Sequence, residues 1–216
     1  MQAILGLTSR SILLNSGRVH SDACSQVAAE NYFALVNRFL TEGFADLTHA
    51  HRNGGDQKIR ITQVTLTNGK SQLKGSFSPG DKINIILQFE SQIHSEDFEI
   101  GYSVRTLAGT ILFTCSSSDH GTLLKVHPGS YRIQTTIEPN YLRPGKYYLQ
   151  LGITCGILRD LIPEAIFFEI TNAGVMSQSP LFGLPGHLYF EYHWKDFRLE
   201  EPSKIEQING LGRSEP

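Results

Sequence analysis

Hydrophobic and polar residues alternate along the middle of the chain, from Lys58 to about Asn172. The alternation recurs in seven short stretches, near 59–66, 83–90, 98–105, 110–115, 131–137, 147–154 and 165–170. A period of two is typical of a β-strand with one buried face, because successive side chains point to opposite sides. The pattern therefore predicts seven strands, with a β-bulge at Thr62-Gln63, where the alternation slips by one residue.

Turn-forming residues separate these stretches, and they include Asn68-Gly69, Ser78-Pro79-Gly80-Asp81, Leu107-Ala108-Gly109, His127-Pro128-Gly129 and Arg143-Pro144-Gly145. Short alternating strands with frequent turns predict an all-β fold, an immunoglobulin-like antiparallel β-sandwich. The segment from Leu142 to Tyr147 has the Leu-x-x-Gly-x-Tyr form of a tyrosine corner. Gly145 and Tyr147 are therefore expected to be structural residues.

The ends of the chain have other patterns. Residues 1–44 begin with two apolar stretches around a glycine, followed by apolar residues at spacings of three and four. This predicts a β-hairpin and then a helix from about Ser25 to Leu40. Residues 45–57 are polar, contain Gly54-Gly55 and are predicted to be a linker.

A β-sandwich domain is expected over 58–197, and it includes an eighth alternating strand with apolar positions Leu188, Phe190, Tyr192 and Trp194. The remaining residues, 198–216, are charged and weakly hydrophobic, so we expect them to be disordered.

Composition narrows the class of protein. The 216 residues carry a net charge of −2, with 40% hydrophobic and 19% charged residues. This is ordinary for a soluble globular protein and lacks the basic surface of a nucleic-acid-binding or membrane-binding domain. No apolar run reaches the length of a transmembrane helix, and no signal peptide is evident. Three widely spaced cysteines do not form a disulfide framework, so we expect a cytoplasmic protein.

No sequence motif predicts catalysis, a cofactor or a metal site. Gly69-Lys70-Ser71 has the end of a phosphate-binding loop, but Val64 stands where the first glycine of that loop is required. Acidic residues gather near Glu96 and Glu99, and paired carboxylates can serve a glycoside hydrolase, although exposed acids are common at strand ends. We therefore expect a protein that is not an enzyme.

The beginning of the chain resembles the last strands and helix of an ABC-transporter ATPase domain, through residues 4–19 and 26–32. Together with the sandwich pattern, the chain resembles the C-terminal part of Wzt-type subunits, the ATPase subunits of exporters for O-antigen and related polysaccharides. The residues that carry this resemblance are Ile59-x-Ile-x-x-Val64, Phe77 to Ile83, Phe89, Gly101 to Arg105 with Gly109, Gly145 to Leu149, and Phe167-x-x-Ile170.

This resemblance implies a carbohydrate-binding module that recognises a lipopolysaccharide O-antigen-type glycan before export, without a cofactor. It also implies a homodimer formed by strand exchange, for which we expect the strand of Leu188, Phe190, Tyr192 and Trp194, and contact with an ABC permease at the inner face of the plasma membrane. The ATP-binding motifs of the family are missing from this sequence, so it is not expected to hydrolyse ATP. A truncated gene product, a fragment and a stand-alone binder all remain open.

Sugar sites combine an aromatic platform with planar polar groups that bind adjacent hydroxyls. In the expected sandwich, the solvent-facing positions of two neighbouring strands are Glu99, Ser103, Arg105, Tyr148, Gln150 and Thr154. Tyr148 with Gln150 and Arg105 is the preferred patch, and an ordinary hydrated sheet face is the alternative. A protein-interaction sandwich and a glycoside hydrolase are the competing functions.

Overall fold

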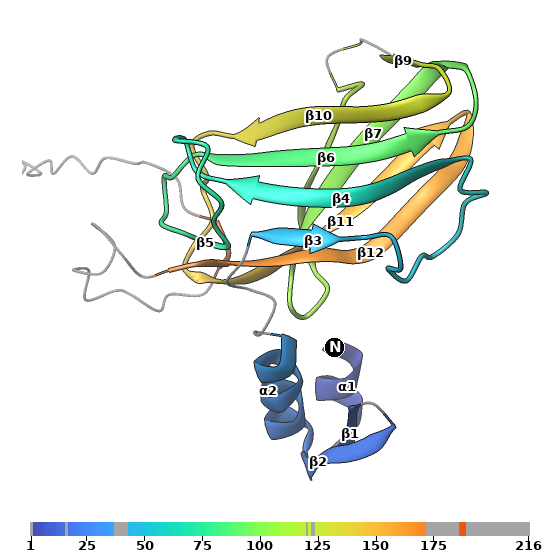
Figure 1. Cartoon of the computed structure of the whole chain (residues 1–216). Helices are drawn as coiled ribbons and strands as arrows, with labels where there is room; N and C mark the ends of the chain where they lie inside the picture. The colour runs from blue at the N-terminus through green and yellow to red at the C-terminus, as the bar shows by residue number, and fades with distance from the viewer. Residues whose placement is uncertain are drawn as a thin grey trace, which may run out of the picture.

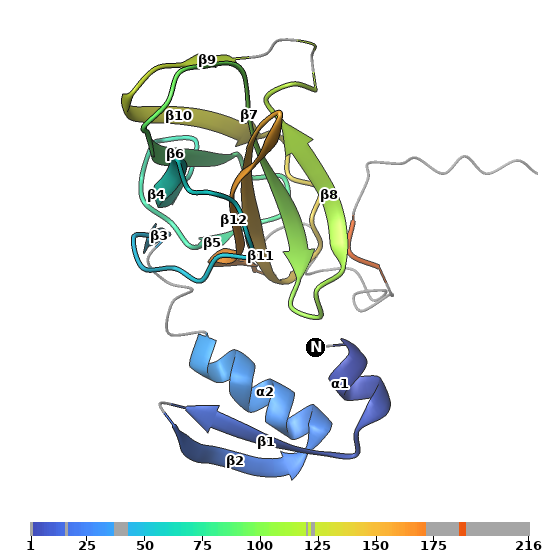
Figure 2. The ribbon, with the colours of Figure 1, turned by 90° about the vertical axis from the view of Figure 1, so that its right-hand side faces the viewer.

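The computed structural model describes residues 2–15, 17–36, 43–119, 121, 124–171 and 186–188. Its N-terminal part is a small unit of α1 (Gln2–Leu7), β1 (Arg10–Asn15), β2 (Arg18–Cys24) and α2 (Ser25–Val36). The strands β1 and β2 pair as an antiparallel hairpin, as expected from the sequence. Figures 1 and 2 show this unit beside a larger β-sandwich. Within the described residues, no helix is long and apolar enough to cross a membrane.

The sandwich consists of two sheets, which confirms the predicted all-β fold. The first sheet has the order β10-β6-β4-β3, with bounds Gly129–Ile137, Ile83–Ser91, Ile59–Thr67 and Phe44–Asp46. The second has the order β5-β12-β11-β7-β8, with bounds Ser76–Phe77, Ile157–Ile170, Gly145–Cys155, Ser95–Thr106 and Ile111–Ser116. A short strand β9 (Leu124–Val126) pairs with β7 outside this order.

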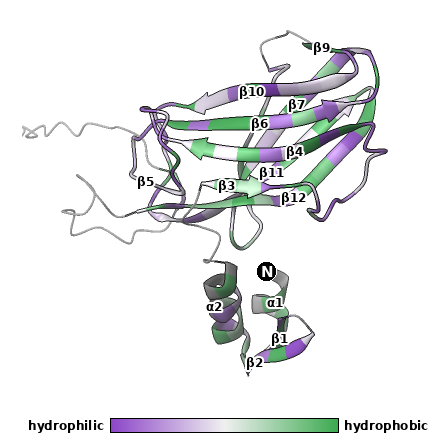
Figure 3. Ribbon diagram, in the orientation of Figure 1, coloured by the Kyte–Doolittle hydropathy of each residue, from purple (hydrophilic) through white to green (hydrophobic). Residues whose placement is uncertain are grey.

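The core lies between the two sheets and is built from alternate residues of the long strands. Hydrophobic and hydrophilic positions are interspersed along β4 and β6 in Figure 3. Phe89 of β6 stacks on Phe98 of the other sheet at 5.0 Å and on Tyr131 of its own sheet at 5.0 Å between ring centroids. Burial of apolar and aromatic area of this kind is the main stabilising contribution in a sandwich.

The seven strands predicted from alternation correspond to β4, β6, β7, β8, β10, β11 and β12, all of them present. The predicted bulge is also present, since the pairing of β4 with β6 shifts between Ile61 and Gln63. Three short strands, β3, β5 and β9, were not predicted, and β12 begins at Ile157 rather than Ala165. The helix α2 ends at Val36 in the structure, and residues 37–40 of the predicted helix lie outside the described residues.

Residues 45–57 differ from the expected linker. Phe44–Asp46 forms strand β3, and residues 47–57, which we call the strap, are hydrogen-bonded to β12 and β4. Within the strap, the backbone N–H groups of Asn53 and Gln57 donate to carbonyls of β12, each at 2.8 Å. A side chain at Gly55 would place its Cβ 2.2 Å from the Arg159 carbonyl oxygen, so only glycine permits this close approach.

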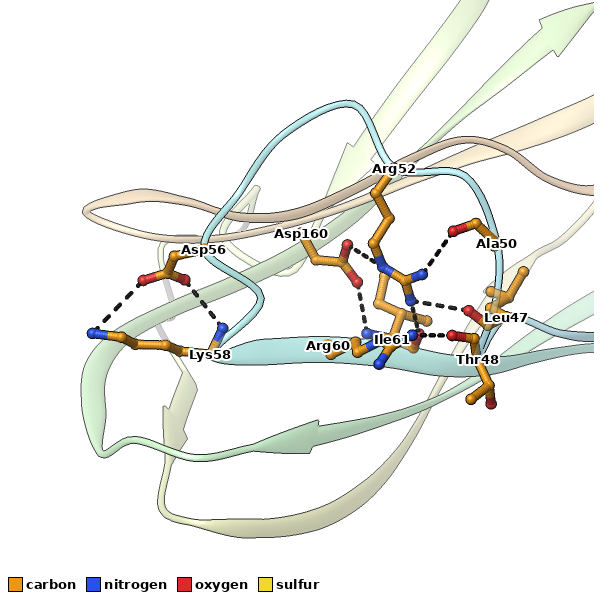
Figure 4. Close-up of polar contacts among 9 residues, drawn as sticks. All are labelled: Leu47, Thr48, Ala50, Arg52, Asp56, Lys58, Arg60, Ile61 and Asp160. Carbon is orange, nitrogen blue, oxygen red and sulfur yellow. Dashed lines mark hydrogen bonds and ion pairs between the residues drawn. The ribbon is translucent and has the colours of Figure 1, made fainter.

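A buried ion pair fastens the strap (Figure 4). The Arg52 side chain is 6% exposed and donates to Asp160 of β12 at 2.9 Å, and the Asp160 side chain is fully buried. Arg52 also donates to the carbonyls of Leu47, Ala50 and Ile61, so its donors are satisfied by the strap and by β4. Polarity in this segment therefore reflects buried hydrogen bonding rather than a solvated linker.

Tyr147 makes the hydrogen bond of a tyrosine corner. Its hydroxyl donates to the Arg143 carbonyl oxygen at 2.7 Å, and its side chain is 2% exposed. Gly145 lies against this ring, because a Cβ at that position would be 3.2 Å from the Tyr147 hydroxyl. Both residues thus pack the corner where the chain enters β11.

Burial raises the pKa of Tyr147 to about 12. In the unfolded chain the phenol ionises near its ordinary value, so rising pH favours unfolding between pH 10 and 12. Stability from this phenol is complete below pH 10 and is lost as pH rises through 12. We expect Tyr147→Phe to flatten the fall in unfolding free energy over this range, as measured by urea denaturation.

Only the first residue of the predicted exchange strand is described. Leu188 forms an isolated antiparallel bridge with Leu142, and the Arg143 guanidinium donates to the Leu188 carbonyl at 3.0 Å. Phe190, Tyr192 and Trp194 lie outside the described residues. Leu188, the first residue of the predicted strand, therefore lies beside the tyrosine corner.

Candidate functional site

The outer face of the second sheet carries an open groove of about 230 Å³. It lies over β7 and β11, which pair antiparallel so that Ser103 is opposite Gln150 and Glu99 is opposite Thr154. These four predicted residues all line the groove. Their side chains point outward because the alternate positions of both strands fill the core. The structure thus brings together four of the six residues predicted from the sequence.

The floor of the groove is formed where two glycines face each other. Gly101 of β7 is directly opposite Gly152 of β11, and both line the groove. Without side chains at these positions the sheet surface is hollowed between the Ser103–Gln150 pair and the Glu99–Thr154 pair. A Cβ at Gly152 would only reach ordinary contact with Leu161 at 3.6 Å, whereas one at Gly101 would be 2.8 Å from a backbone carbonyl. The hollow therefore results from having glycine at these two strand positions.

The walls of the groove differ in polarity. On the β8 side, the Ser103 and Thr114 hydroxyls share a hydrogen bond at 2.8 Å, and the Ser116 hydroxyl bonds that of Ser118 at 2.9 Å. Leu158 and Leu161 of β12 form the opposite wall. Hydroxyl, amide and carboxylate groups on one side and aliphatic groups on the other suit a ligand with hydroxyls and an apolar face.

Tyr148 and Arg105 form the next pair along these strands and are not among the lining residues. The Tyr148 side chain is only 7% exposed, and its ring packs against Phe167 at 5.4 Å between centroids. Burial raises the pKa of Tyr148, and the nearby Arg105 guanidinium opposes that rise. Arg105 also donates to the Gly109 carbonyl at 3.0 Å. The face of Tyr148 is therefore covered rather than presented as a platform.

The sequence prediction missed the other lining residues, namely Gly101, Tyr102, Thr114, Ser116, Gly152, Leu158 and Leu161. The two glycines had a recognisable signal, since a glycine inside a strand often marks a close approach or a hollow. Leu158 and Leu161 had none, because the first half of β12 does not alternate clearly.

The described residues contain no cluster of three or more metal-ligating side chains. The groove residues also do not place a nucleophile beside a base, and Glu99 is the one acidic residue that lines the groove. A glycoside hydrolase of the usual type requires two carboxyl groups across the scissile bond. The groove is thus equipped for binding through hydrogen bonds and aliphatic contacts.

Comparison with known proteins decides the family. The family described as the Wzt C-terminal domain matches residues 50–184, which is more than half of the 216 residues. The chain belongs to this family. Family membership supports a polysaccharide-related role in the context of an ABC transporter, in which the Wzt C-terminal domain is the non-catalytic domain.

A solved structure titled "Crystal structure of the C-terminal domain of wzt" has the same fold as this Wzt-family chain. The two share 14% identity and a TM-score of 0.60, over 72% of this chain and 92% of that chain. A second structure, the X-ray structure of Northeast Structural Genomics Consortium target SoR45, has 15% identity over 66% of this chain and 98% of that chain, with a TM-score of only 0.29. No curated protein matches the chain. The α1–α2 unit lies outside residues 50–184, so its resemblance to an ATPase domain end stays a prediction.

Proposed function

We propose that this chain binds a bacterial surface polysaccharide of the O-antigen type for export by an ABC transporter, without itself hydrolysing ATP. The observation that carries the proposal is the groove over Gly101 and Gly152, lined on one side by polar side chains and on the other by leucines. A sugar ring has hydroxyls at its edge and an aliphatic C–H face, which match these two walls. Membership of the Wzt C-terminal domain family supports this reading of the groove.

Hydrogen bonding to sugar hydroxyls is assigned to four residues: Gln150, Ser103, Glu99 and Thr154. Gln150 supplies an amide donor and acceptor from one planar group, which suits two adjacent hydroxyls. Leu158 and Leu161 contact the C–H face of the ring. Tyr148 and Arg105 support the end of the groove through their contact with each other and through the packing of Tyr148 on Phe167.

Removal of the Gln150 amide tests this assignment. We expect Gln150→Ala to weaken binding of polysaccharide from the same organism about fivefold to tenfold, the loss of roughly one to two net hydrogen bonds. Isothermal titration calorimetry of the folded chain measures the change. Arg132→Ala, on the exposed face of the other sheet, is the matched control and should retain wild-type affinity. Absence of binding by the wild-type chain to any polysaccharide of that organism would contradict the proposed function.

The proposal includes a homodimer formed by exchange of the strand that begins at Leu188. The bridge from Leu188 to Leu142 supports it, because it places the first residue of the expected exchange strand against an ordered segment of the sandwich. We expect the full chain to sediment as a dimer and a chain ending at His187 to sediment as a monomer with an intact sandwich. Identical sedimentation of the two would remove the strand from the interface. Contact with an ABC permease at the cytoplasmic face of the plasma membrane belongs to the same proposal.

A further inference from the structure

A second and larger cavity lies on the opposite side of β7 and β8 from the groove. It has a volume of about 380 Å³ and is lined by residues of β6 and β10 from one sheet and of β7 and β8 from the other. In the described residues, β8 is the last strand of one sheet order and β10 is the last strand of the other. Within the part of the chain that the structure describes, no third strand pairs with β8 or β10 along this space. We call this space the edge cavity.

The floor of the edge cavity is apolar. It is formed by Leu87 of β6, Ile100 of β7, Leu124 of β9 and Ile133 of β10. Leu87 and Ile100 belong to the buried core, and Leu124 and Ile133 are half-buried against it. A sandwich usually closes such a space with side chains, since protein interiors are close-packed. Here the cavity exposes part of Leu124 and Ile133, while Leu87 and Ile100 lie beneath them in the core.

Polar groups converge above this floor. Tyr102 projects inward from β7, and its hydroxyl interacts with the Cys115 thiol and the Thr135 hydroxyl. Burial raises the pKa of Tyr102, so the phenol stays protonated and able to donate. The mouth carries Ser117, Asp119 and Gln134. The Asp119 carboxylate already accepts the Ser116 N–H at 2.7 Å, through one of its two oxygens.

We infer that the edge cavity is a second binding site, for a single neutral sugar ring or a polyol ring of similar size with an apolar face. The volume is within the range of small-molecule sites, which are mostly apolar with a few placed polar groups. The C–H face of the ring packs on Leu124 and Ile133, and its hydroxyls bond Tyr102 and Asp119. A neutral ligand is indicated because the described lining includes one carboxylate and no cation.

This inference rests on the proposed function in part, because it gives the same glycan two contacts on one domain. The groove and the edge cavity share Gly101, Tyr102 and Ser116 and are separated by the layer of β7 and β8. Two weak sites on one polymer raise the overall affinity above that of either site when the polymer can reach both.

Cys115 provides a direct probe of the edge cavity. It lines the cavity and is partly exposed, Cys155 is buried, and the exposed Cys24 can be replaced. In a Cys24→Ser chain, the rate of alkylation of Cys115 by iodoacetamide is measured with methyl glycosides of glucose, galactose, mannose and rhamnose. We expect at least one glycoside to slow alkylation, with half-protection at about 1 to 10 mM, the range of a single-ring contact.

Two variants separate this site from the groove. Tyr102→Phe retains the ring and removes the hydroxyl, and we expect it to raise the half-protection concentration about tenfold, the loss of one buried hydrogen bond. Gln150→Ala, which alters the groove alone, should leave protection of Cys115 unchanged. Protection by a glycoside without polysaccharide binding would support the edge cavity and refute the groove.

The inference is overturned if no glycoside changes the alkylation rate of the wild-type thiol up to about 100 mM, well above the expected half-protection. It is also overturned if glycerol, which has hydroxyls but no ring face, protects equally well. Protection that falls in Gln150→Ala as much as in Tyr102→Phe would assign the effect to the groove and likewise refute the second site.

Discussion

Replacing Asp160 with alanine is expected to lower the free energy of unfolding by about 3 to 5 kcal/mol, the cost of leaving a buried charge without its partner. The stranded group is the Arg52 guanidinium, which is 6% exposed and cannot reach water without displacing the strap. The Ile61 N–H, which donates to Asp160 at 2.8 Å, loses its acceptor as well. Urea denaturation followed by circular dichroism measures the change.

The control for this prediction is Asp56→Ala. Asp56 pairs with Arg159 at 2.5 Å, but its side chain is 32% exposed, so solvent screens the pair and its loss should cost far less than that of Asp160. A double variant, Arg52→Met with Asp160→Leu, removes both charges and should recover part of the loss, because a buried pair can often be replaced by apolar residues. Equal costs for Asp56→Ala and Asp160→Ala would show that the buried pair does not fasten the strap.

Burial also changes the pKa of the Asp160 carboxyl group. Desolvation raises the pKa of the Asp160 carboxyl, and the Ile61 N–H and the Arg52 guanidinium offset only part of that rise. The pair is therefore held at a desolvation cost, which fits a role in fixing one path for residues 47–57 rather than in raising stability.

Filling the groove at Gly152 should have the largest effect on binding. We expect Gly152→Leu to weaken polysaccharide binding at least about a hundredfold, or roughly 2.7 kcal/mol, because the side chain occupies the space between the two polar pairs. The backbone at Gly152 is not in the left-handed region, and an added Cβ would be in ordinary contact with the Leu161 side chain at 3.6 Å. The sandwich should therefore remain folded. Calorimetric titration with an unfolding curve on the same sample distinguishes lost binding from lost structure.

Gly69→Leu is the matched control for Gly152→Leu. The backbone at Gly69 is also outside the left-handed region. An added Cβ there would contact the Lys82 side chain at 3.5 Å, away from the groove. Gly69→Leu should bind with wild-type affinity. Binding by Gly152→Leu that matches this control would place the polysaccharide outside the groove. Gly101→Ala is less informative, because its Cβ would meet a backbone carbonyl at 2.8 Å and disturb the sheet.

Alternation was sufficient to predict the long strands because each one buries a single face. In β6 and β11 the inward positions are apolar almost without exception, so the period of two is plain in the sequence. The alternation failed in the first half of β12, where Asp160 is buried although it is charged. It also failed in the strap, where Arg52, the ion-pair partner of Asp160, is buried as well. Burial of a polar residue depends on a partner far away in sequence, which a local pattern does not record.

The groove was only partly predictable for a similar reason. The two-residue alternation along β7 and β11 determines which side chains lie on the outer face of the sheet. Those of Glu99, Ser103, Gln150 and Thr154 could therefore be predicted to lie together. The cover over Tyr148 comes from Phe167, whose position depends on the register of β12 against β11. Register is set by the whole sheet and its bulges, and the sequence alone did not supply it.

The bound strap also limits how far the sandwich can move from the α1–α2 unit. If residues 37–58 were all free, an extended chain from Val36 to Ile59 could span about 80 Å, at roughly 3.5 Å per residue. Because strand β3 begins at Phe44, the span from Val36 to the sandwich is at most about 28 Å. The strap thus reduces the largest possible separation between the α1–α2 unit and the sandwich to about a third, so a ligand of the proposed groove would be held at a high effective concentration near α1 and α2.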